Sequence, residues 1–118
     1  MRELRCIVFN EKEVVTAVID HRHSKRKPLP VGMVRGIAIN TDGRNTCSLK
    51  LEDYDGKRNA VSITEAELAA ALIEYCLSRR IPMPRKSDKE INVVGGDIMM
   101  VMTISNFDLV RTPPTRMA

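Results

Sequence analysis

Aromatic side chains are nearly absent from this chain. It has no Trp, and its few aromatic residues are Phe9, Tyr54, Tyr75 and Phe107. The core must therefore be aliphatic, filled by Val, Ile, Leu, Ala and an unusual number of Met. The same scarcity argues against stacking of nucleic-acid bases, because binding of that kind needs aromatic platforms.

Long apolar runs and an even set of cysteines are missing too. No segment approaches the roughly 18 apolar residues of a membrane span, and the first residues, MRELRCIVFN, lack the apolar run of a signal peptide. Cys6, Cys47 and Cys76 are odd in number, far apart and set among apolar neighbours. They are predicted to be reduced core residues of a cytoplasmic protein that does not associate with membranes.

The remaining composition is that of an ordinary globular domain. The chain has 118 residues, of which 43% are hydrophobic and 29% charged. This length favours one domain with one core. The net charge of +4 permits an acidic partner without requiring one.

An internal repeat with an offset of 54 residues is the strongest feature of the sequence. NEKEVVTAVIDHRHSKRKPLP (10–30) and TEAELAAALIEYCLSRRIPMP (64–84) are identical at eight of 21 positions without a gap. Ordinary composition gives roughly one or two such matches. Each of these two segments is predicted to begin with a helix, because apolar residues recur at helical spacing and prolines follow the basic last turn.

Both predicted helices begin with the pattern of a capping box. Asn10 and Thr64 are good N-cap residues, and Glu13 and Glu67 follow three positions later. In a capping box, each side chain bonds the backbone N–H of the other residue. The sequence therefore predicts the same box at the start of both helices.

The segments around the two helices read as strands. The predicted strands are 4–9, 35–39 and 46–52 in the first repeat, and 58–63, 89–93 and 98–105 in the second. The predicted fold class is α+β: a two-layer sandwich with about six strands and two helices, made of a tandem strand–helix–strand–strand repeat with an internal pseudo-twofold axis. Residues 1–110 are expected to form a single domain of two repeats, 1–54 and 55–108. A disordered tail is expected at 111–118.

The sequence offers no constellation that supports catalysis or metal binding. His21 and His23 are two residues apart, which points their rings in nearly opposite directions on a helix. His21 aligns with Tyr75 and is expected at the margin of the core, with His23 on the surface. The first-turn glutamates suit helix capping, and Gly95-Gly96 suits a hairpin turn. The chain is therefore predicted to be no enzyme, with no catalytic residue, metal or cofactor.

Basic residues cluster at the end of each predicted helix and are candidate binding residues. They are Arg22, Lys25, Arg26 and Lys27 in the first repeat, and Arg79, Arg80, Arg85 and Lys86 in the second. Solvation of the helix end explains one such cluster, but a repeated pair could also bind a nucleic acid or another polyanion. The dipole of a helix C-terminus disfavours anions, which argues against that function.

The segment IMMVM (98–102) is apolar on both faces of a strand. Met99, Met100 and Met102 are therefore candidate interface residues. A central strand that is covered on both sides explains the pattern, and so does an edge strand that pairs with a second subunit. A pocket for a small apolar ligand is the third explanation. The counterpart CSLKL (47–51) alternates apolar and polar residues, as a half-exposed strand should. The strand of the second repeat is therefore expected to cover an additional surface that the strand of the first repeat does not.

The doubled strand–helix–strand–strand order resembles modules that small-molecule-binding regulators of the gyrase-inhibitor type use in tandem. Single copies of such modules mediate protein contacts in cell-division and RNA-polymerase subunits. The first hypothesis is therefore a non-enzymatic interaction domain that self-associates as a homodimer and binds a protein partner. The alternatives are binding of nucleic acid through the basic helix ends, and binding of a small apolar ligand between the two halves.

Overall fold

The computed structural model describes residues 2–39, 47–84 and 87–105, and these form two helices and six strands. The elements in chain order are β1 (Arg2–Phe9), α1 (Glu11–Ser24), β2 (Met33–Ile39), β3 (Cys47–Glu52), β4 (Arg58–Ile63), α2 (Glu65–Ser78), β5 (Asp88–Val94) and β6 (Asp97–Ser105). The predicted α+β fold with a tandem strand–helix–strand–strand order is confirmed. The predicted tail, 111–118, lies outside the described residues.

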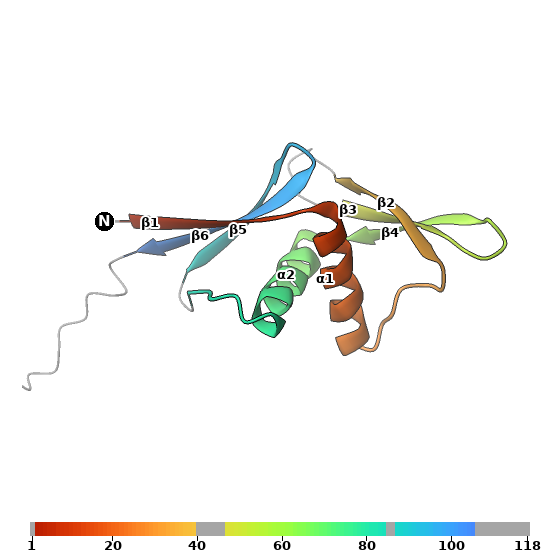
Figure 1. Cartoon of the computed structure of the whole chain (residues 1–118), viewed down its shortest axis with the longest axis horizontal. Helices are drawn as coiled ribbons and strands as arrows, with labels where there is room; N and C mark the ends of the chain where they lie inside the picture. Colours follow the sequence, from red (N-terminus) through yellow and green to blue (C-terminus); the bar gives the residue numbers. More distant parts are fainter. Residues whose placement is uncertain (1, 40–46, 85–86, 106–118) are drawn as a thin grey trace, which may run out of the picture.

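The strands form two antiparallel three-stranded sheets with the orders β1-β6-β5 and β2-β3-β4. The sheets lie side by side, and both helices lie beneath them (Figure 1). Each sheet combines the first strand of one repeat, β1 or β4, with the last two strands of the other repeat. Each helix therefore connects two different sheets, and the right-handed crossover expected between parallel strands does not arise.

The hydrogen-bond register is the same in the two sheets once the repeats are exchanged. In each sheet, the last residue of the strand before the helix lies opposite the beginning of the central strand. The matching rows are Phe9, Ile98 and Val93 in one sheet, and Ile63, Cys47 and Ile39 in the other. This register supports the internal repeat, while the pseudo-twofold axis that would relate the two halves stays a prediction.

Both sheets and both helices contribute to one buried apolar cluster. α1 and α2 pack against each other and turn their apolar stripes toward the sheets. The helix residues in this cluster include Val14, Ala17, Val18, Leu68, Ala71 and Leu72, and the strand residues include Leu49, Ile91, Met100 and Met102. The core is mainly aliphatic, as predicted, but Met100 and Met102 are the only methionines among the buried residues that the structure describes. Phe9 and Tyr75 add an edge-to-face contact.

The capping box that the sequence predicts is complete in α1 but not in α2. Asn10 Oδ1 accepts from Glu13 N–H at 2.8 Å, and Glu13 Oε1 accepts from Asn10 N–H at 3.0 Å. Thr64 also accepts from Glu67 N–H, but the Glu67 carboxylate binds Arg22 rather than Thr64. The prediction of a second capping box is therefore only half correct: the bond to the Thr64 side chain forms, but the bond from the Glu67 carboxylate to Thr64 N–H does not. Two charge-assisted hydrogen bonds from the Arg22 guanidinium are stronger than one bond from a backbone N–H.

Both helices end in the same motif, which turns the chain back at an arginine. Arg26 and Arg80 have φ angles of 58° and 56°, in the left-handed region that favours glycine. The N–H of Lys27 then donates to Arg22 C=O, and the N–H of Ile81 donates to Cys76 C=O. These are the bonds of a Schellman motif, which satisfies carbonyls at the helix end.

The strand that contains IMMVM is the centre of its sheet. β6 pairs with β1 along one edge and with β5 along the other. The edge-strand explanation is therefore wrong, because no free edge of β6 remains for a second subunit. β5 and β6 are joined at Gly95 and Gly96, whose φ angles of 60° and 118° suit the predicted hairpin turn.

Replacement of Met100 by Ala tests the shared core. The side chain is fully buried, so its truncation should lower the free energy of unfolding by about 2–5 kcal/mol. The matched control is Met33→Ala, which shortens a side chain in a residue that is 61% exposed and should change stability by less than about 0.5 kcal/mol. Urea denaturation measures both values, and similar small losses would contradict the described packing.

Candidate functional site

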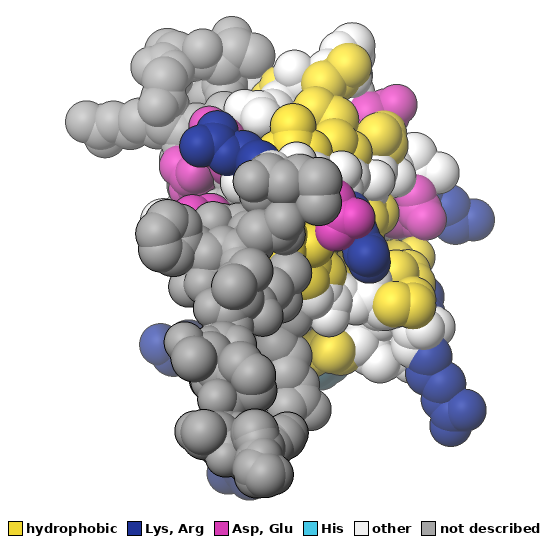
Figure 2. All heavy atoms as spheres, turned by 90° about the vertical axis from the view of Figure 1, so that its left-hand side faces the viewer, with side chains coloured by type: hydrophobic (Ala, Val, Ile, Leu, Met, Phe, Trp, Pro, Cys, Tyr) yellow, Lys and Arg dark blue, Asp and Glu magenta, His cyan; other side chains and the backbone are white. Residues whose placement is uncertain are grey.

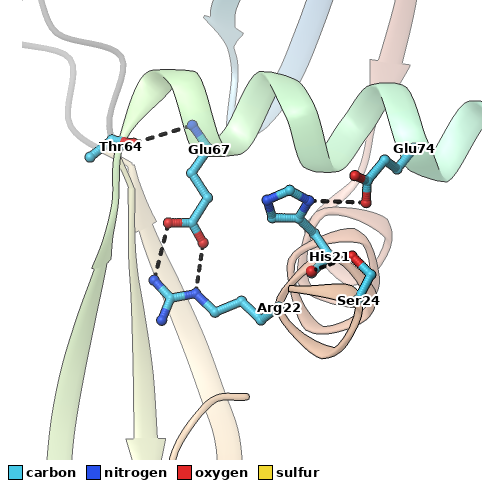
Figure 3. Close-up of polar contacts among 6 residues, drawn as sticks. All are labelled: His21, Arg22, Ser24, Thr64, Glu67 and Glu74. Atoms are coloured by element: carbon cyan, nitrogen blue, oxygen red, sulfur yellow. Dashed lines mark hydrogen bonds and ion pairs between the residues drawn. The ribbon is translucent and has the colours of Figure 1, made fainter. Parts of the chain in front are cut away.

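One ion pair and one hydrogen bond join the end of α1 to α2. Arg22 binds Glu67 through Nε and Nη2, with distances of 2.6 Å and 3.1 Å to the two carboxylate oxygens. Both side chains are only 22% exposed. His21 Nδ1 lies 3.0 Å from Glu74 Oε2, and the imidazole is buried (Figure 3). These contacts fix the packing of the two helices at a position where the apolar stripe of α1 ends.

The ion pair of Arg22 is specific to one half of the molecule. The 54-residue offset relates Arg22 to Cys76, and Glu67 to Glu13. A thiol cannot attract the Glu13 carboxylate as a guanidinium does, so Glu13 remains available for its capping box. Burial raises the pKa of the Cys76 thiol, and the negative charge of Glu13 raises it further. One substitution between the repeats thus explains why their helix starts differ.

A cavity of about 410 Å³, the basic pocket, lies beside these two contacts. Its lining residues are His21, Arg22, Lys25, Lys27 and Glu67. The pocket brings together three of the basic residues predicted from the sequence with a carboxylate from α2. His21 is buried and His23 is exposed, in agreement with the prediction.

The other predicted basic residues have different surroundings. Arg26, Arg79 and Arg80 are exposed, and the Arg79 guanidinium lies 3.7 Å from the centre of the Tyr75 ring. Both helices run away from the sheets and end on the same side of the molecule (Figure 1). The structure therefore places the basic helix ends on one side, whereas Arg85 and Lys86 lie outside the described residues.

The outer face of the β1–β6–β5 sheet, on the side away from the core, is the second candidate surface. Leu4 and Val8 on β1 are 60% and 54% exposed, and Cys6 between them is exposed as well. The register places Cys6 beside Val101 and Val8 beside Met99. The prediction that Cys6 lies in the core is therefore wrong, because Cys6 alternates with the inward-facing Ile7.

Hydrophobic side chains reach the surface in the upper part of Figure 2, on the sheet side of the molecule. The equivalent face of the other sheet is different, since Ser48, Lys50, Ala60 and Ser62 occupy it. The apolar outer face was missed from the sequence, because Leu4, Cys6 and Val8 alternate with Ile7 and Phe9, and the sequence does not say which of these two apolar rows is exposed.

The three candidate interface methionines divide between the two faces of β6. Met100 and Met102 are 0% and 1% exposed and belong to the core, which argues against a role for them in an interface. Met99 points to the outer face and is half-buried. Of the three, only Met99 is placed where a partner could contact it.

Two further cavities lie near the β2–β3–β4 sheet. A cavity of about 660 Å³ is lined by Arg35, Lys50, Leu51, Glu52, Arg58, Asn59 and Ala60. A third, of about 400 Å³, lies between α1 and β2. Most of the residues that line each cavity are charged or polar, and binding of an apolar ligand between the halves stays a prediction. Among the described residues, no group of three or more His, Cys, Asp or Glu side chains could hold a metal ion.

No protein-family model matches the chain, and neither the curated proteins nor the solved structures give a significant match. Within the ranges that the structure covers, no helix is both long enough and apolar enough to cross a membrane.

A double-mutant cycle on Arg22 and Glu67 tests the ion pair between the helices. Arg22→Ala and Glu67→Ala should each destabilise the protein, with a coupling energy of about 1 kcal/mol or more, because the pair is bidentate and largely shielded from water. The control cycle uses Arg35 and Glu52, whose distance is also 2.6 Å but whose Arg side chain is 60% exposed. Its coupling should be smaller, below about 0.5 kcal/mol. Equal couplings in chemical denaturation would argue against the shielded geometry.

The raised pKa of the Cys47 thiol leads us to expect that the protein loses stability at alkaline pH. Burial, and secondly the charge of Glu67, raise the pKa of Cys47 from its ordinary value of 9.0 to about 11. Between these values the thiol ionises in the unfolded chain but not in the folded one, so stability falls as the pH rises. Cys47→Ala should make this decline shallower, and Cys6→Ala, at an exposed position, should leave it unchanged. Denaturation midpoints at several pH values measure the decline; the same slope in both variants would refute this assignment.

Proposed function

We propose that this protein is a non-enzymatic interaction domain that self-associates through the outer face of the β1–β6–β5 sheet. The observation that carries the proposal is the exposed apolar surface formed by Leu4, Cys6 and Val8 with the half-buried Met99 and Val101. Soluble monomers seldom expose contiguous apolar patches, and such patches commonly mark protein contacts. This surface also accounts for a central strand that is apolar on both faces.

The charges at the margins of this face suit a second copy of the chain. Arg2 lies on the outer face at the β1 edge, whereas Asp88 and Glu90 lie on it at the β5 edge. When two copies pack face to face with β6 over β6 and parallel strand directions, β1 of each copy lies over β5 of the other. Arg2 of one copy then approaches Asp88 of its partner, which favours this self-complementary arrangement.

The size of the face indicates a weak dimer. Three strands about 4.8 Å apart, each some 25 Å long, present a footprint of roughly 350 Å². Stable protein interfaces bury about 800 Å² on each partner. Self-association should therefore depend on protein concentration, with the monomer prevailing in dilute solution.

The substitution Val8→Lys tests this interface. It places a charge within the apolar face and should raise the dimer dissociation constant by about tenfold or more, because the ammonium group would have to be desolvated. Sedimentation equilibrium over a wide range of protein concentrations measures the constant.

The matched control is Ser62→Lys, the equivalent position in the second repeat, which is exposed on the outer face of the other sheet. This variant should dimerise like the original protein. A monomer mass at every concentration, or equal weakening by the two lysines, would sink the proposal.

Binding of a polyanion through the basic helix ends is the second candidate function. The exposure of Lys25, Arg26 and Lys27, together with Arg79 and Arg80 at the end of the other helix, favours it.

We further propose that the protein is located in the cytoplasm, because its three cysteines are unpaired and a reducing compartment keeps thiols in that state.

A further inference from the structure

We infer that the basic pocket binds the phosphate group of a small phosphorylated molecule, a function independent of self-association. The pocket contains four basic or imidazole side chains and one carboxylate. That carboxylate, of Glu67, is neutralised by two bonds from Arg22. Neither Lys25 nor Lys27 forms an ion pair with another described residue. Two uncompensated positive charges therefore face the cavity, which matches the charge of a phosphate monoester.

The position of the pocket at a helix C-terminus does not oppose this inference, because the last carbonyls of α1 are already occupied. His21 C=O accepts from Lys25 N–H and from the Ser24 hydroxyl. The carbonyls of Arg22 and His23 accept from the N–H groups of Lys27 and Arg26. The negative end of the helix is thus satisfied within the chain, and the side chains determine the charge of the pocket.

The turn at Arg26 also explains why the two lysines line one cavity. The left-handed conformation of Arg26 reverses the chain, and the N–H of Lys27 returns to within 2.9 Å of Arg22 C=O. Lys25 and Lys27 are therefore held next to the same turn of α1. A non-glycine residue at this position costs about 1 kcal/mol, so the local fold accepts strain where the basic residues converge.

His21 adds a directional group to the pocket. Its Nδ1 faces Glu74, and the other ring nitrogen, Nε2, points toward the Arg22–Glu67 pair in Figure 3. His21 Nδ1–H donates a hydrogen bond to the Glu74 carboxylate, which leaves Nε2 with a free lone pair when the ring is neutral. Nε2 can then accept a hydrogen bond from a hydroxyl of the ligand. The pocket thus offers cations for phosphate oxygens and an acceptor for a neighbouring hydroxyl group.

The shape of the site favours a small molecule over a nucleic acid. A volume of about 410 Å³ falls within the range of roughly 300–1,000 Å³ that is typical of small-ligand pockets. The charges converge on one concavity, whereas a duplex backbone needs cations along an extended stripe. A phosphorylated sugar has both the anionic group and the hydroxyls that the lining residues would bind.

Calorimetric titration of the full chain with ribose 5-phosphate and with inorganic phosphate, at low salt, tests the inference. Both should bind saturably, and ribose 5-phosphate more tightly, because its hydroxyls reach His21. Lys25→Ala/Lys27→Ala should weaken binding by about tenfold or more, since charge-assisted hydrogen bonds are lost. Both lysines are exposed, so the circular dichroism spectrum and melting temperature of this variant should not change.

Two further variants decide whether the ligand occupies this pocket. Lys50→Ala/Arg58→Ala removes two cations from the 660 Å³ cavity and should leave affinity unchanged. Glu67→Gln removes the only carboxylate of the basic pocket and should tighten binding several-fold. The inference is overturned by an absence of saturable binding, by equal losses in both double variants, or by an unaltered affinity of Glu67→Gln. Tight binding of a short RNA with no binding of ribose 5-phosphate would also overturn it, in favour of a polyanion.

Discussion

The exchange of strands between the two repeats is the constraint on which the rest of the structure depends. β1 of the first repeat pairs with β6 of the second, and β4 of the second pairs with β3 of the first. Each sheet is therefore incomplete without the other half of the chain, and residues of both halves share one apolar cluster. A single repeat of about 54 residues could cover neither its sheet nor its helix stripe. The two helices lie beneath both sheets and pack against each other, and the same exchange brings them together.

Differences between the repeats arise where single residues break the equivalence. Arg22 captures Glu67 at one end of the helix pair, whereas Cys76 at the corresponding position leaves Glu13 to cap its own helix. Similarly, Val8 makes one outer face apolar where Ser62 keeps the other polar. The framework of strands and helices thus occurs in both repeats, while the basic pocket and the apolar face each occur once. The apolar face and the basic pocket therefore lie where the two copies have diverged.

Local patterns in the sequence predicted the helices, their N-caps, the strands and the hairpin at Gly95 and Gly96, because each depends on residues close in sequence. The partner of each strand could not be predicted, since antiparallel strands from either repeat satisfy the same alternation. Whether the Glu67 carboxylate caps its own helix or binds Arg22 depends on a residue 45 positions away in the sequence. Local patterns could therefore not predict it. Apolar residues occupy both faces of β1, so only tertiary packing decides that Phe9 is buried and Val8 exposed.

Nuclear Overhauser effects between backbone protons of opposing strands test the strand exchange most directly. The structure requires cross-peaks that link β1 to β6, for example around Val8 and Met99, and cross-peaks that link β4 to β3, around Ser62 and Ser48. Cross-peaks that instead link β1 to β3, and β4 to β6, would show two sheets formed within separate repeats and would contradict the shared architecture.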